Sequence, residues 1–106
     1  MSPDMSKGLT LLRQQIDELE SLKKQTLQDL NTIAGTERIA QWKVHTVALI
    51  TDAVGHLEGQ AFARIQPGPS FTNDLVEEFA DLVECYRSPL IILAKRLAAQ
   101  APSPER

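Results

Sequence analysis

Apolar side chains recur along the first third of the chain at spacings of three and four residues, the period of an amphipathic α-helix. The stripe shifts to neighbouring positions after Leu19. A shifting stripe rotates around its helix, so we expect this helix to change neighbours halfway along. It is expected to end near Ala34, with Gly35 as its C-terminal stop. The first part of the stripe comprises Leu9, Leu12, Ile16 and Leu19, and the second part comprises Leu22, Leu27, Leu30 and Ile33.

A second helix is predicted over residues 37–54, with Thr36 as its N-cap. Its apolar residues extend around more than one side, which is typical of a helix packed by neighbours on both flanks. Gly55 is expected to end it, and residues 58–65 have the pattern of one or two further helical turns. The segment QPGPS, residues 66–70, breaks the helical pattern because Pro-Gly-Pro cannot continue a helix.

The last helix carries the cleanest periodicity in the chain and is predicted to begin at Thr72 or Asp74. Asp74 and Glu77 have the spacing of a capping box. Pro89 either kinks this helix or stands at the first position of a new helix capped by Ser88. We favour the kink, because the apolar register continues across Pro89. The apolar positions are Leu75, Phe79, Leu82, Tyr86, Leu90, Leu93 and Leu97.

These elements predict an all-α fold, a small up-down bundle of three main helices plus one short helix. A chain of 106 residues fits one domain, which we place at residues 7–100. Residues 1–6 and 101–106 are predicted to be disordered ends. Only five residues are aromatic, so aliphatic side chains must fill most of the core.

The formal net charge is −3, and no run of Lys and Arg is longer than two residues. Nucleic acid is therefore not an expected partner, because phosphate binding needs clustered cations. No apolar run approaches the ~20 residues of a membrane span, and MSPDMSKG lacks the regions of a signal peptide. Cys85 is the only cysteine, which excludes an internal disulfide and favours a reducing cytoplasm.

No motif for catalysis, metal or nucleotide binding is present, and no enzyme activity or cofactor is predicted. An enzyme would need a site around His45, His56 and Asp52, but a surface His–carboxylate pair is the more common arrangement. No tetrahedral set of zinc ligands can be assembled from the sequence. Cys85 lies mid-helix beside Glu84, an environment that favours a half-buried structural cysteine over a nucleophile.

Three features suggest contact with another protein. The first apolar stripe is able to pack within the bundle or against another copy of the chain. Trp42 is predicted to be core, with an interface hot spot as the alternative. Carboxylates follow one another along the start of the last helix, as a solvated face or as an acidic partner-binding patch. The candidate partner-interface residues are Leu9, Leu12, Ile16, Leu19, Trp42, Glu77, Glu78 and Asp81.

The segment ERIAQWKVHTVALITDAVGHLEGQAFARI, residues 37–65, resembles a helical module near the N-termini of bacterial antiphage effector and abortive-infection proteins. There the module precedes TIR-like or nucleotide-sensing domains and carries no catalytic residues. Val54 stands where that pattern has an aromatic residue, and Gly59 takes the place of its small residue. The resemblance implies a helical adaptor. The matching positions are Trp42, Lys43, Thr46, Leu49, Ile50, Gly55, Phe62 and Ile65.

The sequence therefore predicts a non-enzymatic helical module for protein–protein interaction or oligomerisation, an adaptor or regulator in bacterial antiphage defence. Its expected partner is a protein, with a homo-oligomer as the expected assembly. The alternative is a small acidic inhibitor or antitoxin-like regulator, bacterial or phage-encoded, that docks on a basic site of a partner protein.

Overall fold

The computed structural model describes residues 5–68 and 74–100, and these residues form helices and no strand. The helices are α1 (Met5–Asp29), α2 (Thr32–Ala53), α3 (His56–Ala63) and α4 (Leu75–Gln100). Three of them have 22 residues or more, whereas α3 has 8. The predicted fold class, three main helices plus one short helix in an all-α bundle, is confirmed.

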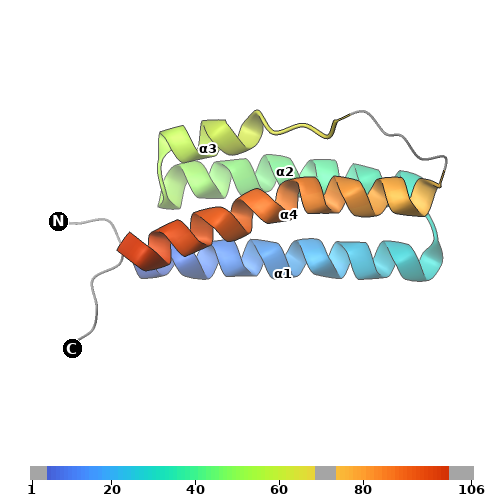
Figure 1. The fold of residues 1–106 in the computed structure, drawn as a ribbon, viewed down its shortest axis with the longest axis horizontal. Helices are drawn as coiled ribbons and strands as arrows, with labels where there is room; N and C mark the ends of the chain where they lie inside the picture. Colours follow the sequence, from blue (N-terminus) through green and yellow to red (C-terminus); the bar gives the residue numbers. More distant parts are fainter. Residues whose placement is uncertain (1–4, 69–73, 101–106) are drawn as a thin grey trace.

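The three long helices lie side by side along the long axis of the molecule (Figure 1). α1 packs against both α2 and α4, while α3 packs against α2. α2 and α4 run opposite to α1, and α3 turns back along α2 in the direction of α1 (Figure 1). α3 covers only part of the length of α2, and the chain continues from it without helical structure as far as Gly68.

The core lies between the three long helices and is closed at one side by α3. Three aromatic rings contact one another in it, those of Trp42, Phe62 and Tyr86, whose centroids are 5.9 to 6.2 Å apart. Burying each large apolar side chain stabilises the fold by about 1.5–3 kcal/mol. The remaining core residues are aliphatic apart from Phe79: Leu12, Leu19, Ile39, Ile50, Val83, Leu90, Leu93 and Leu97.

The predicted boundary between the first two helices is wrong. α1 ends at Asp29, five residues before the expected end at Ala34. Leu30 follows with a φ of 56°, the left-handed conformation that reverses the chain. Asn31 then caps α2, because its side-chain oxygen accepts a hydrogen bond of 3.1 Å from the backbone N–H of Ala34.

Gly35 is therefore inside α2 and does not stop a helix, and Thr36 is not an N-cap. A Cβ atom at Gly35 would lie 2.5 Å from the side chain of Thr26 and 3.0 Å from the ring of Phe79. Glycine at this position lets α2 approach α1 closely. The hydroxyl of Thr36 donates a hydrogen bond of 2.7 Å to the carbonyl of Thr32 within the same helix.

The other predicted boundaries agree with the structure to within one or two residues. α2 ends at Ala53, and Asp74 caps α4 by accepting hydrogen bonds from the backbone N–H groups of Val76 and Glu77. Pro89 lies inside one continuous helix that changes direction along its length, so the favoured kink is confirmed (Figure 1). The predicted disordered ends fall mostly outside the described residues, although α1 already begins at Met5.

Candidate functional site

The structure places most of the predicted apolar interface inside the bundle. Leu12, Leu19 and Trp42 are buried in the core of the single chain. Leu9 and Ile16 are partly buried and pack against that core. The apolar stripe of α1 is thus used for packing against α2 and α4, and only its margins remain open to a partner.

Trp42 has a polar contact that the periodicity of the sequence did not reveal. Its indole N–H donates a hydrogen bond of 3.2 Å to the main-chain carbonyl of Gln15. The side-chain carbonyl of Gln15 accepts a second bond, of 2.8 Å, from the hydroxyl of Thr46. Gln15 lies off the apolar stripe in the sequence, yet its side chain is buried, and the hydroxyl of Thr46 satisfies its carbonyl oxygen there.

Within the part of the chain that the structure describes, neither His45 nor His56 forms a hydrogen bond or ion pair with a carboxylate. Both are exposed, and the Nε2 atom of His56 lies 2.9 Å from the side-chain nitrogen of Gln60 rather than against Asp52. Among the described residues, no three His, Cys, Asp or Glu side chains gather closely enough to hold a metal ion.

Cys85 lies in a half-buried environment that opposes its ionisation. Burial raises the pKa of its thiol, and the positive charge of Lys43 offsets only part of that rise. The ammonium group of Lys43 donates a hydrogen bond of 2.6 Å to the carbonyl of Ile65 and lies 4.9 Å from the centre of the Tyr86 ring. Lys43 of α2 therefore contacts both the segment just after α3 and a ring of α4. The sequence did not predict this role.

In the described part of the chain, two surface grooves lie beside α4. The α3–α4 groove has a volume of about 290 Å³ and follows the kink at Pro89, with Phe62 and Ile65 on one wall and Ile92 on the other. The α2–α4 groove has a volume of about 800 Å³ and lies between the first turns of α2 and α4. It opens where α3 has already ended and Pro67 and Gly68 continue without helical structure.

Large apolar side chains are exposed at both grooves. Ile33 and Leu75, in the α2–α4 groove, are 77% and 62% exposed, and Ile92, in the α3–α4 groove, is 59% exposed. Val44 is 73% exposed and lines neither groove. Isolated exposed apolar residues are ordinary, whereas apolar residues that gather in a groove suggest a contact surface.

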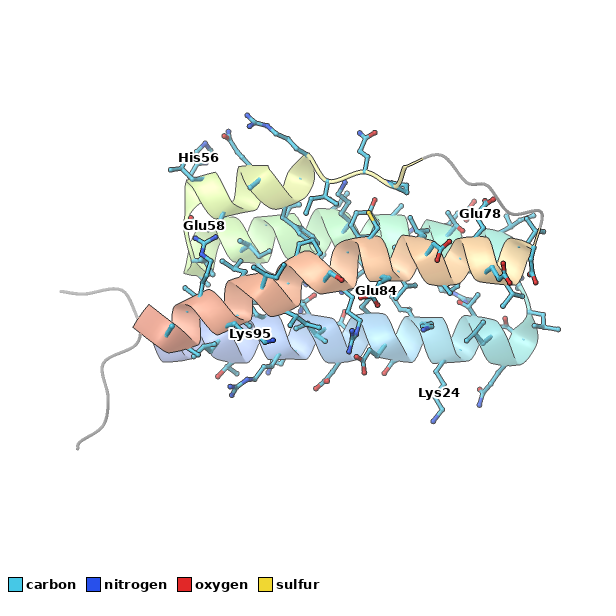
Figure 2. All side chains as sticks on the ribbon, in the orientation of Figure 1. Lys24, His56, Glu58, Glu78, Glu84 and Lys95 are labelled. Atoms are coloured by element: carbon cyan, nitrogen blue, oxygen red, sulfur yellow. The ribbon has the colours of Figure 1, made fainter. Side chains whose placement is uncertain are left out.

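The predicted acidic patch meets the α2–α4 groove. Glu77, Glu78 and Asp81 are exposed, and Glu78 and Asp81 line the groove together with Glu37 of α2. Figure 2 shows Glu78 at the end of the bundle where α4 begins, away from His56 and Glu58 at the other end. Glu84 lies further along α4, where it accepts a hydrogen bond from Ser88.

No protein-family model matches the chain, and neither a curated protein nor a solved structure matches it. Four of the residues that carry the resemblance to antiphage modules are buried in the structure: Trp42, Thr46, Ile50 and Phe62. Those positions therefore serve core packing. Within the described residues, no helix has both the length and the apolar character needed to cross a membrane.

Proposed function

We propose that the protein is a non-enzymatic helical interaction module that self-associates through the α3–α4 groove. The observation that carries this proposal is the composition of the groove. Its floor is apolar, Ile92 projects from it, and its rim holds one anion, Glu58, and one cation, Arg96.

A rim with both charges suits a two-fold contact between identical chains. In such a contact each copy presents the same patch, so Glu58 of one copy meets Arg96 of the other. Within one chain the two groups are 3.9 Å apart and remain partly exposed, an arrangement that contributes little stability to the monomer. Figure 2 shows Glu58 on α3 where that helix faces α4.

Light scattering over a concentration series tests self-association directly. We expect the mass to rise above that of one chain with concentration, and Ile92→Glu to hold the chain as a monomer. Val44→Glu is the matched control, because it places the same charge at a site of similar exposure outside both grooves. A monomer at every concentration, or equal loss of association in both variants, would overturn the proposal.

Charge exchange tests the two-fold geometry. Arg96→Glu gives a rim with two anions, and Glu58→Arg gives a rim with two cations, so each variant alone should repel its own copies. An equimolar mixture of the two should associate again, because each anion then meets a cation of the other chain. A mixture that stays monomeric contradicts this interface.

The biological setting that we propose is bacterial antiphage defence in the cytoplasm. This setting is supported by the resemblance of residues 37–65 to the helical module of bacterial antiphage effector proteins, and not by the fold. Phage plating efficiency on cells with and without the gene tests it, and equal plating on both would exclude this role for the phages used.

A further inference from the structure

The α2–α4 groove is the place where a longer third helix would lie. α3 stops at Ala63, and from there to Gly68 the described chain adds no helix over the facing sides of α2 and α4. Two large apolar side chains are exposed there, Ile33 on α2 and Leu75 on α4. The partly buried Leu82 and the buried ring of Phe79 lie beside them in the lining. In a helical bundle such faces are normally covered by another amphipathic helix.

The length of the groove sets the size of an occupant. Its lining on α4 runs from Leu75 to Leu82, about two turns, or roughly 12 Å at 1.5 Å per residue. A volume of about 800 Å³ is enough for several apolar side chains. A short helix of two to three turns therefore matches the space, with its apolar face on Leu75 and Ile33.

The charge around the groove sets the chemistry of the occupant. Glu37, Glu78 and Asp81 line it, and within the described residues none of the three forms an ion pair. The sequence contains no Lys or Arg between Arg64 and Arg87. The residues that line the groove thus include three carboxylates and no Lys or Arg, and this lining would attract Lys and Arg that flank an apolar helix face.

We propose that the α2–α4 groove binds a basic amphipathic helix of a partner protein. This site is separate from the self-association groove and does not depend on it. A second copy is a poor occupant, because two acidic rims brought together in a two-fold contact repel each other. An anionic partner such as nucleic acid is repelled for the same reason.

The first experiment uses three labelled synthetic peptides of about 14 residues, long enough for the groove at 1.5 Å per residue. One contains Leu at helical spacing with Lys between, the second replaces Lys with Glu, and the third scrambles the Leu–Lys order. Fluorescence anisotropy should show saturable binding of the first peptide, about tenfold or more tighter than the others. Equal binding of the scrambled peptide, or no binding of the first, would overturn the proposal.

Variants of the full chain then test the location. Glu78→Lys with Asp81→Lys should weaken binding of the first peptide by about tenfold or more. Asp17→Lys with Glu18→Lys is the matched control, because it makes the same charge change on an exposed face of α1. Equal weakening in both double variants would mean general charge attraction and would contradict a defined site.

The apolar part of the site has its own pair of variants. Ile33→Ser should weaken the peptide complex, whereas Val44→Ser, at a similarly exposed position outside the groove, should leave it unchanged. Ile92→Glu should also leave it unchanged, which separates this site from the self-association groove. If Ile33→Ser instead lowers the mass in solution and spares peptide binding, the occupant is a second copy and the proposal is wrong.

Discussion

The hydroxyl of Thr46 on α2 donates a hydrogen bond of 2.8 Å to the side-chain carbonyl of Gln15 on α1, inside the core. Both residues are buried, at 0% and 3% exposure. Because the main-chain carbonyl of Gln15 also accepts the indole N–H of Trp42, one residue of α1 holds two positions of α2 that are one turn apart. This contact fixes the register of the two helices.

Breaking this hydrogen bond from one side should cost more than removing both partners. Thr46→Val leaves the Gln15 oxygen buried without its donor, and we expect a loss of about 1–3 kcal/mol in the free energy of unfolding. Gln15→Leu should cost a similar amount, and the double variant should cost less than the sum. Urea unfolding of all four proteins gives the coupling energy. Strictly additive losses would show that the bond does not stabilise the pair.

The close approach of α2 to α1 at Gly35 gives a second prediction. Alanine normally stabilises a helix interior relative to glycine by up to about 1 kcal/mol, but here the added methyl would overlap the side chain of Thr26. Gly35→Ala should therefore lower the melting temperature, and adding Thr26→Ala should restore part of it. Gly68→Ala is the control, since a Cβ atom added at Gly68 would have no other atom within 4 Å. A stabilising Gly35→Ala would contradict the packing described for these helices.

The apolar stripe of α1 packs inside the bundle, and Leu19 tests this role. Leu19 is fully buried in the core, so Leu19→Ala should cost about 2–5 kcal/mol of folding stability. Ile33→Ala, at an exposed position, should change stability by no more than about 0.5 kcal/mol. Thermal or urea unfolding measures both. If Leu19→Ala keeps its stability and loses only self-association, the stripe is an interface after all.

The parts of the fold that follow from local periodicity could be predicted from the sequence. Three long helices, the short α3 and the kink at Pro89 each leave a signal in the spacing of apolar residues or in a proline. The end of α1 does not, because Leu30 continues the apolar pattern while it adopts a left-handed conformation that leucine seldom takes. Gly35 then gives a false stop signal, since its small size serves a contact with Thr26.

The features that the sequence did not predict depend on contacts between distant residues. Gln15 and Lys43 have partners more than 20 residues away, and no local pattern indicates that a polar side chain will be satisfied there. The acidic residues of α4 were correctly placed on the surface. Their place beside an apolar groove follows from the packing of α2 and α4 beyond the end of α3, which no local pattern in the sequence indicates.

The burial of Cys85 predicts how the thiol reacts with pH. Burial raises its pKa, so the folded chain holds the thiol proton more tightly than the unfolded chain does. The rate of alkylation by iodoacetamide should therefore reach its midpoint at higher pH in the native protein than in urea.

Lys43→Met should move the native midpoint higher still, because the lysine charge favours the thiolate, whereas Lys24→Met, on an exposed position of α1, should not. The same difference in pKa makes the folding stability depend on pH. The contribution of Cys85 is fully present below the pKa of its thiol in the unfolded chain, and it is lost as the pH rises through the pKa of the thiol in the folded chain. A native midpoint at or below the urea value would mean that Cys85 is an activated thiol, contrary to the environment in this fold.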